Sequence, residues 1–280
     1  MRFTKMQGIG NDYVYVNCFE ETVLHPSELA RRVSDRHYGI GSDGLILIGP
    51  SWQADLRMRM FNADGSEGKM CGNGARCVGK YAYDHGICRR NEMLLETAAG
   101  NRRIRVHADT PGASRESFVT VDMGEAKLTG PIPEMIEVAG TEREMIAVEV
   151  GNPHAVYRVS SREALEALDL EAIGPFYESH PRFPEGVNSE FVFAEDRNNL
   201  YMRVWERGSG ETLACGTGAT ASAYALYRAG VCDPRVTVHL RGGDLEIALR
   251  EDGHLDMTGS AVEVFQGEWR EEEESSCRGR

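Results

Sequence analysis

LRMRMFNADGSEGKMCGNGARCVGKYAYDHGI, residues Leu56–Ile87, stands a second time in the chain, 144 residues later, as LYMRVWERGSGETLACGTGATASAYALYRAGV, residues Leu200–Val231. The two stretches align without a gap, and 10 of the 32 aligned positions are identical. An internal duplication of this length predicts two similar halves related by approximate two-fold symmetry. It places Cys71 and Cys215 in equivalent positions, from which they can face each other across one cleft.

Each copy predicts a strand followed by a helix. Apolar residues alternate with arginines over 56–60, which is the pattern of a half-buried strand. After Cys71 the apolar residues recur at helical spacing, and Gly86 is placed to end that helix. The second copy repeats the pattern, with a strand predicted over 200–205 and a helix over 219–229. Each cysteine therefore stands between a strand and the start of a helix.

The rest of the chain predicts many short strands. Further helices are expected over 26–34 and 162–168, and strands over 3–17 (interrupted by a glycine turn), 45–48, 93–107, 118–123, 146–150, 155–159, 187–194, 236–240, 244–250 and 262–265. The polar segment 109–116 contains Pro111 and Gly112 and is the predicted boundary between the halves. We expect an α+β fold with an N-terminal half 1–115 carrying Cys71, a C-terminal half 116–261 carrying Cys215, a final strand 262–268 that packs back on the first half, and a disordered tail 271–280.

Composition excludes several classes of protein. The 280 residues carry a net charge of −13, which disfavours nucleic acid or an anionic membrane surface as a partner. There is no apolar run long enough to cross a membrane, and the first residues lack the apolar core of a signal peptide, so we expect a cytoplasmic protein. The seven cysteines form no C-x-x-C pair and no even disulfide framework, so neither a structural metal nor disulfides are expected.

The position of the two cysteines suggests acid/base chemistry. A helix N-terminus carries unpaired N–H groups and a partial positive charge, which lowers the pKa of a thiol and can hold a carboxylate. Glycines after each cysteine let such an anion approach the backbone. If both helices point at one ligand, one thiolate can remove its α-proton while the opposite thiol protonates the other face. Inversion at a carbon next to a carboxylate is the predicted reaction.

Several motifs resemble those of the diaminopimelate epimerase family. Asn62–Ser66 followed by Met70–Arg76, MCGNGAR, resembles its first cysteine motif, and Trp205–Thr212 with Ala214–Gly218 resembles the second. The segments Gly8–Asp12, Gly151–His154 and Val187–Glu190 are similar to the remaining motifs, in the same order. The resemblance covers about residues 1–267.

The resemblance implies a fold of two pseudo-symmetric halves, each a barrel-like, mostly antiparallel sheet around a central helix. It implies an isomerase that interconverts LL- and meso-diaminopimelate without a cofactor, in lysine and cell-wall precursor synthesis, and that forms a homodimer. The implied roles are as follows: Cys71 and Cys215 exchange protons; Gly72, Asn73, Gly216 and Thr217 hold the reacting carboxylate; Asn11, Asn62, Asn152, Asn188 and Arg207 bind the rest of the substrate; His154 and Glu206 tune the thiols, and Glu206 also contacts substrate. One departure is Ser42, where some relatives carry a substrate-binding glutamine, and that contact is not expected here.

Two alternatives remain open at this stage. Another cofactor-independent racemase on the same scaffold would act on proline, hydroxyproline or histidine, but the proline type carries a histidine where this chain has Asn73. A redox or metal-binding protein would use Cys71 and Cys215 as a dithiol. Exchange of a substrate α-proton distinguishes an epimerase from the second alternative.

Overall fold

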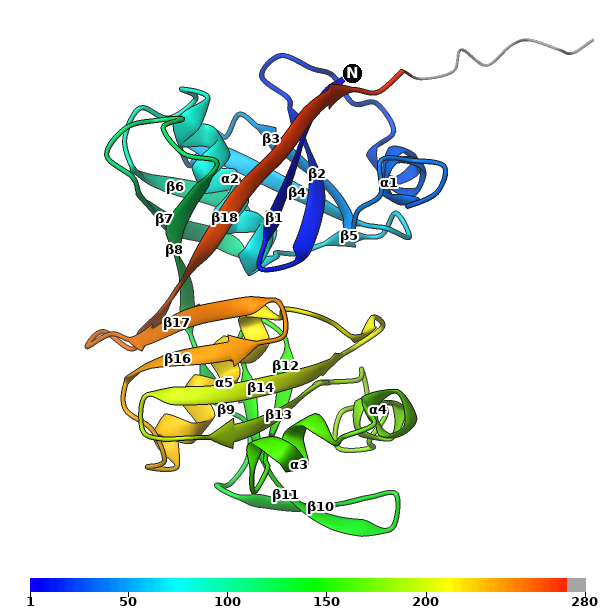
Figure 1. Cartoon of the computed structure of the whole chain (residues 1–280), viewed down its shortest axis with the longest axis vertical. Helices are drawn as coiled ribbons and strands as arrows, with labels where there is room; N and C mark the ends of the chain where they lie inside the picture. The colour runs from blue at the N-terminus through cyan, green and yellow to red at the C-terminus, as the bar shows by residue number, and fades with distance from the viewer. Residues whose placement is uncertain (271–280) are drawn as a thin grey trace, which may run out of the picture.

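Two lobes of similar build make up the molecule (Figure 1). The structure is a computed structural model that describes residues 1–270, so the predicted disordered tail 271–280 lies outside the described residues. Over that range the chain forms eighteen strands and five α-helices. No helix in residues 1–270 is both long and apolar enough to cross a membrane.

The upper lobe in Figure 1 is a closed barrel of strands, which we call the N-terminal barrel. Its elements are β1 (Arg2–Gly8), β2 (Asn11–Asn17), α1 (Pro26–Ser34), β3 (Gly44–Gly49), β4 (Leu56–Asn62), β5 (Glu67–Gly68), α2 (Gly72–Asp84), β6 (Glu92–Thr97), β7 (Gly100–His107), β8 (Glu116–Glu125) and β18 (His254–Glu268). The strands pair in the circuit β1–β2–β3–β4–β6–β7–β8–β18, and β18 pairs back with β1. Closure leaves no barrel strand with an unpaired edge.

The lower lobe repeats this arrangement and is called the C-terminal barrel. Its elements are β9 (Lys127–Leu128), β10 (Glu134–Val138), β11 (Thr141–Glu149), β12 (Pro153–Arg158), α3 (Arg162–Glu166), α4 (Leu170–Glu178), β13 (Asn188–Ala194), β14 (Asn199–Glu206), β15 (Gly210–Glu211), α5 (Gly216–Arg228), β16 (Arg235–Leu240) and β17 (Gly243–Leu249). The pairs β12–β13 and β14–β16 are parallel, just as β2–β3 and β4–β6 are in the first barrel. Parallel and antiparallel pairs follow in the same order in both barrels. This confirms that the two copies of the repeated sequence belong to two halves of similar structure.

Strands β8 and β18 join the two barrels. The antiparallel pair runs from His254 opposite Glu125 to Val262 opposite Glu116. Strand β17 pairs with the first part of β18, and β1 pairs with residues 262–268 of the same strand. Because one long strand serves both sheets, the barrels are joined by backbone hydrogen bonds as well as by side chains. The domain boundaries at 115 and 261 stay a prediction.

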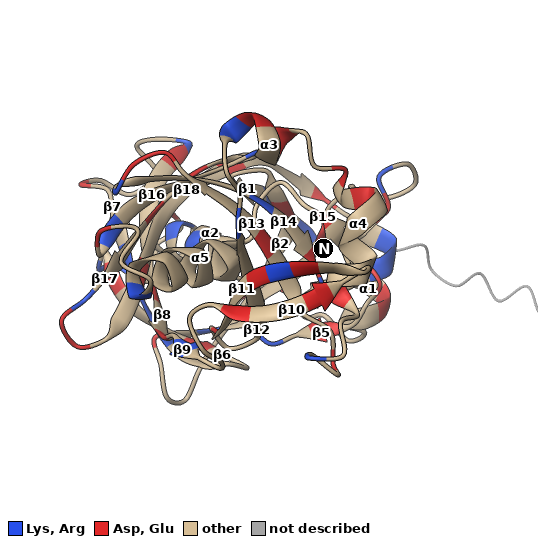
Figure 2. Ribbon diagram, turned by 90° about the horizontal axis from the view of Figure 1, so that it is seen from below, with Lys and Arg blue, Asp and Glu red and all other residues tan. Residues whose placement is uncertain are grey.

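The helices α2 and α5 lie inside the two barrels, surrounded by strands in the end-on view (Figure 2). Every residue of α2 from Gly72 to Tyr83 is buried, and most of α5 is buried as well. A helix with no solvent-exposed face must be packed on all sides, which a barrel provides. The predicted fold class, two mostly antiparallel barrels around central helices, is confirmed.

The outer faces of the barrels are covered by the remaining helices. In β3, Ile46 and Ile48 point to the core around α2, while Leu45 and Leu47 pack against α1. Both faces of this strand are therefore buried, which explains its unbroken apolar sequence. A separate apolar cluster, which includes Leu165, lies beneath α3 and α4 on the outside of the C-terminal barrel.

Most predicted elements are found, with some corrections. The helix predicted over 26–34 is confirmed as α1. The strand predicted over 93–107 is wrong as a single element, because a turn at 98–99 divides it into β6 and β7. Helix α4 was not predicted; Pro175 lies inside it, and proline ordinarily interrupts a helix. Its Leu170 and Tyr177 are buried, so tertiary packing stabilises a segment of weak helical pattern.

Candidate functional site

Both cysteines of the repeat cap the N-terminus of a central helix. Cys71 precedes α2, and its sulfur accepts a hydrogen bond of 3.3 Å from the backbone N–H of Gly74. Cys215 precedes α5, and its sulfur accepts an equivalent bond of 3.3 Å from Gly218. Each thiol therefore occupies the place that a serine or aspartate takes in an ordinary N-cap. The predicted position between strand and helix is confirmed.

The two helix N-termini meet at the junction of the barrels. The side-chain amide of Asn73, in the first turn of α2, donates to the carbonyl oxygen of Ala214 at 3.3 Å. Met257 of β18 contacts both ends, because a Cβ built on either Gly72 or Gly216 would lie 2.8 Å from its side chain. Glycine at these two positions allows the helix ends to approach the same methionine. The structure brings together the four residues expected to hold a carboxylate, since Thr217 follows Gly216 in the same turn.

Each thiol has a polar partner besides its own helix. The sulfur of Cys71 lies 3.3 Å from the amide oxygen of Asn11, the first residue of β2. The sulfur of Cys215 lies 3.5 Å from the hydroxyl of Thr217. The carboxyl group of Glu206, at the end of β14, accepts a hydrogen bond from the hydroxyl of Thr212 and interacts with the thiol of Cys215. Three of the predicted site residues therefore contact the cysteines directly.

Burial controls the ionisation of both thiols. Loss of solvent raises the pKa of Cys71, and the N–H of Gly74 opposes that rise only in part. The pKa of Cys215 is raised well above its ordinary value by burial and then by the carboxyl groups of Glu206 and Glu190. The expectation that the helix N-termini lower both thiol pKa values is therefore wrong, because desolvation outweighs the helix N–H groups. Glu206 raises the pKa of both thiols, so one carboxyl group acts on both.

His154 belongs to a buried polar cluster behind Cys215. Its Nδ1 lies 2.7 Å from the carboxylate of Glu190, and both side chains are fully buried. Its Nε2 lies 3.0 Å from the amide oxygen of Asn152. The carboxylate of Glu190 lies against α5, because a Cβ built on Gly218 would be 2.7 Å from its Oε1. His154 therefore reaches Cys215 through Glu190 rather than by direct contact.

The other predicted polar residues lie at the barrel ends where the helices begin. Asn62 is the last residue of β4 and pairs with Gly44, the first residue of β3. Asn188 is the first residue of β13 and pairs with His154 of the parallel strand β12. Because β14 runs antiparallel to β13, its last residue, Glu206, lies at the end where β13 begins. Strand direction thus gathers residues from separate segments.

The side chains of Asn188 and Asn62 form hydrogen bonds with groups other than the thiols. The amide oxygen of Asn188 accepts the backbone N–H of Arg207 at 2.9 Å, and the guanidinium of Arg207 donates to the carbonyl of Glu185. The side chain of Asn62 bonds Ser66 in its own turn, at 3.0 Å. Asn188 and Arg207 are therefore brought together, whereas the side chain of Asn62 forms no hydrogen bond with another predicted site residue within residues 1–270. Ser42 is buried, and its hydroxyl donates to the backbone carbonyl of Gly44.

Sequence analysis missed the roles of two buried charged residues. Glu190 and Arg76 both stand in the quoted motifs, yet neither was assigned a function. Glu190 lies on β13 among apolar residues, on the face that points toward α5. A carboxylate at a core-facing position of a strand is the signal that could have identified it. Arg76 stands on the first turns of α2, which is buried on all sides. A charged residue in a buried helix is the same kind of signal.

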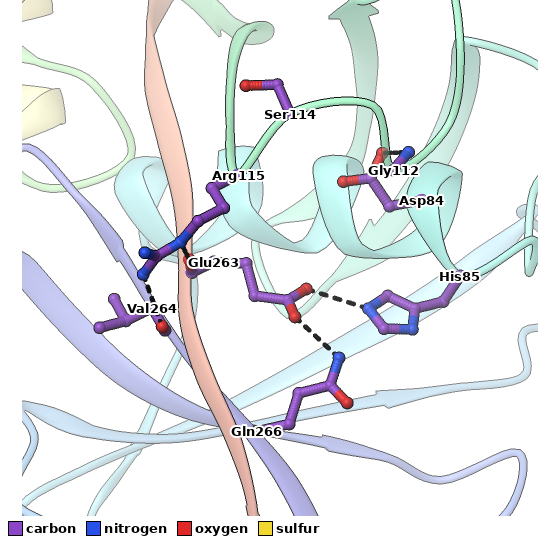
Figure 3. A pocket seen from close by; sticks show the side chains of 8 residues that line it. All are labelled: Asp84, His85, Gly112, Ser114, Arg115, Glu263, Val264 and Gln266. Atoms are coloured by element: carbon purple, nitrogen blue, oxygen red, sulfur yellow. Dashed lines mark hydrogen bonds and ion pairs between the residues drawn. The ribbon is translucent and has the colours of Figure 1, made fainter.

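A surface cavity of about 380 Å³ lies at the opposite end of α2, away from Cys71 (Figure 3). Asp84 and His85 stand at the C-terminal end of the helix, and the carboxylate of Glu263 accepts from His85 at 3.1 Å and from Gln266 at 2.7 Å. These side chains already pair with one another. The thiols and the residues around them, rather than this cavity, form the candidate site.

Comparison of the sequence with protein families and with curated proteins identifies the diaminopimelate epimerase family. The sequence model of the diaminopimelate epimerase family matches residues 3–129 and 146–264. A diaminopimelate epimerase from Acetivibrio thermocellus is 53% identical, with 96% of this chain and 98% of the relative covered. One from Bacillus subtilis is 47% identical, with 95% and 97% covered.

Solved structures share the fold at much lower sequence identity. A hydroxyproline epimerase from Agrobacterium vitis is 15% identical with a TM-score of 0.68, covering 95% of this chain and 91% of that one. A phenazine biosynthesis protein of the PhzF family from Bacillus anthracis is 16% identical with a TM-score of 0.70, covering 95% and 98%. These two similarities concern the fold alone.

Proposed function

Because the chain belongs to the diaminopimelate epimerase family, we propose that Cys71 and Cys215 act as an acid/base pair on the α-carbon of diaminopimelate. The enzyme is an isomerase of lysine biosynthesis, and the reaction exchanges the LL and meso forms. The observation that carries the proposal is the pair of equivalent helix caps, in which each sulfur stands at the N-terminus of a central helix and the two helix ends contact the same methionine.

The proposed reaction transfers one proton on each face of the carbon. A thiolate takes the α-proton, so the C–H bond breaks and an S–H bond forms. The opposite thiol then gives its proton to the other face, which leaves that second cysteine as the thiolate. The two thiols supply both the acceptor and the donor, so the proposed reaction uses no cofactor.

The helix ends are proposed to stabilise the charge that develops on the substrate. Removal of the α-proton spreads negative charge onto the adjacent carboxylate. Backbone N–H groups at Gly72 and Asn73 and at Gly216 and Thr217 are proposed to hold that carboxylate. Their dipoles are fixed before the reaction, which favours the transition state over the ground state.

The remaining polar residues are proposed to bind the unreactive end of the substrate. That end carries an amino group and a carboxylate, and it needs both acceptors and donors. Arg207 is suited to the carboxylate, since a guanidinium donates two parallel hydrogen bonds. The amides proposed to complete this site are those of Asn11, Asn62, Asn152 and Asn188. Glu206 is proposed to touch the substrate as well as the thiols, and His154 to act through Glu190.

The working unit and its location are also proposals. We propose a division into residues 1–115 and 116–261, with 262–268 returning to the first half, as the pairing of β18 with β1 supports. We further propose a homodimer in the cytoplasm. Sedimentation of the full chain tests the dimer.

Exchange of the α-proton tests the proposed reaction. The full chain, incubated with LL-diaminopimelate in D₂O without added cofactor, is expected to form the meso compound and to place deuterium at the α-carbon. Cys71→Ala and Cys215→Ala are each expected to abolish epimerisation with the fold retained. Full activity in either variant would refute the relay, and activity on proline, hydroxyproline or histidine without activity on diaminopimelate would refute the substrate.

A further inference from the structure

We propose that two buried charges of opposite sign make the thiols unequal, so that Cys71 loses its proton more readily than Cys215 in the enzyme without substrate. The inference rests on the proposed function and deepens it, because it assigns which thiol becomes the base first. It concerns Arg76 and Glu190, which we treat as positioning residues. Neither needs to touch the substrate.

The first difference lies in the strands behind the two helix caps. Ile46 of β3 and Glu190 of β13 are 144 residues apart, the same separation as the two cysteines. A Cβ built on Gly74 would lie 2.6 Å from the terminal methyl of Ile46, and one built on Gly218 would lie 2.7 Å from Oε1 of Glu190. The same place in the two barrels thus holds a methyl group behind Cys71 and a carboxyl group behind Cys215.

The second difference lies on the helices themselves. Arg76 of α2 corresponds to Thr220 of α5, again 144 residues apart. Arg76 is fully buried; its guanidinium donates to the carbonyl of Ser260 at 3.1 Å and to the amide oxygen of Asn73 at 2.9 Å. Thr220 instead donates its hydroxyl to a carbonyl of its own helix. Only the N-terminal barrel has a cation at this place.

No carboxylate of residues 1–270 forms an ion pair with Arg76, and one of its guanidinium nitrogens, Nη2, has no hydrogen-bond partner there. Burying a charge without a counter-ion is unfavourable, because the ion loses its hydration and gains no partner. An anion near the start of α2 would offset that cost. A Cys71 thiolate meets the requirement, because Arg76 acts on Cys71 to lower its pKa against the effect of burial.

Several charged and titratable groups surround the two thiols. Cys71 is faced by Tyr13 and Tyr15 of β2, by Arg76 and Cys77 of α2, and by Glu206 of β14. Burial raises the pKa of Cys77 to about 11, so this second thiol beside Arg76 stays neutral near neutral pH. Cys215 is faced by Glu206 of β14 and Glu190 of β13, with His154 of β12 on the far side of the Glu190 carboxylate. Glu206 acts on both thiols and so does not separate them. The groups that differ are the cation beside Cys71 and the second carboxyl group beside Cys215.

The assignment determines how a catalytic cycle begins. A substrate whose α-proton faces Cys71 meets an enzyme ready to react: its C–H bond breaks, Cys71 gains the proton, and Cys215 protonates the opposite face. The product leaves a Cys71 thiol and a Cys215 thiolate. The resting state returns when Cys71 releases a proton to water and Cys215 takes one up.

Alkylation of the substrate-free enzyme tests the assignment. The full chain is treated with iodoacetamide over a range of pH, and the modification of each cysteine is followed by peptide mass spectrometry. The quantity compared is the pH at half-maximal rate of alkylation. The rates themselves would also depend on how accessible each sulfur is to the reagent, because Cys71 is the more exposed thiol. We expect the midpoint of Cys71 to lie below that of Cys215 by about one pH unit or more.

Two variants separate the contributions of the buried charges. Glu190→Gln keeps the shape of the side chain and removes its charge. It is expected to lower the Cys215 midpoint by about one pH unit and to leave the Cys71 midpoint unchanged. Arg76→Met is expected to raise the Cys71 midpoint by a similar amount, and Arg76→Lys to restore it. If Arg76→Met does not fold, the order of the two midpoints in the wild-type protein and the effect of Glu190→Gln still test the inference.

Asp84→Asn is the matched control, because Asp84 is a buried carboxylate at the opposite end of α2, paired with Lys80. Neither midpoint is expected to move in that variant. A Cys215 midpoint equal to or below that of Cys71, or one unchanged by Glu190→Gln, would overturn the inference. Alkylation involves no turnover, so this result is separate from the loss of epimerisation that tests the proposed function.

Discussion

The side-chain amide of Asn73 donates to the carbonyl oxygen of Ala214 at 3.3 Å, joining the first turn of α2 to the residue before Cys215. The oxygen of the same amide accepts from Arg76 at 2.9 Å. One buried side chain thus connects the two helix ends to each other and to the buried guanidinium. Both halves of the site depend on this amide for their relative placement.

Asn73→Ala is expected to lower both stability and activity. The change removes the donor to the Ala214 carbonyl and leaves Nη1 of Arg76 with only the sulfur of Met257, a weak acceptor, and a buried group that loses its hydrogen bond costs about 1–3 kcal/mol. Urea denaturation measures the free energy of unfolding, and kcat is measured on the folded fraction. Asn101→Ala, at an exposed position near the start of β7, is the control and should change stability by less than about 0.5 kcal/mol. Equal effects of the two changes would contradict the proposed connection.

Gly218→Ala is expected to damage catalysis while the protein still folds. The new Cβ would lie 2.7 Å from the Glu190 carboxylate and 3.2 Å from the Cys215 sulfur, so one of these groups must move. A displacement of about 1 Å at a reacting group can cost about 100-fold in rate. Gly49→Ala is the matched control, since its Cβ would meet only Cys18, at 3.6 Å. Wild-type kcat in Gly218→Ala would show that the thiol tolerates displacement.

His154→Ala is expected to be strongly destabilising. It removes the partner of a fully buried carboxylate, and breaking such a pair typically costs about 3–5 kcal/mol. The free energy of unfolding is obtained from urea denaturation near neutral pH. His25→Ala, which removes an exposed histidine, provides the comparison and should have little effect. A His154→Ala protein as stable as the wild type would contradict the importance of this buried pair.

Glu206→Gln is expected to change the pH dependence of stability. Burial raises the pKa of Glu206 above its unfolded value, so the native state favours the protonated carboxyl group. The stability that this preference contributes is present below the unfolded pKa of about 4.3 and is lost as pH rises through the raised native value. The amide variant does not titrate. Its stability relative to wild type should therefore increase from about pH 4 toward neutrality, as measured by urea midpoints, and a constant difference would contradict the raised pKa.

Local sequence patterns determined much of the architecture. The duplication predicted two similar halves, the family resemblance implied that each is a barrel, and the change from alternating to helical spacing at Cys71 and Cys215 predicted both caps. Hydrogen bonds within a turn and the period of buried residues depend on neighbours in the chain, which is why these features can be read from sequence. The same reasoning missed α4, because its stability comes from packing against β13 and β14 rather than from its own pattern.

The ionisation of the thiols was decided only by tertiary structure. The sequence placed each cysteine at a helix N-terminus and so predicted a lowered pKa, but the folded protein buries both sulfurs and raises it. The charges that distinguish them, on Arg76 and Glu190, act through space across strands far apart in the chain. A pKa depends on solvent access and on every charge within a few ångströms, and only the closed barrels determine which groups those are.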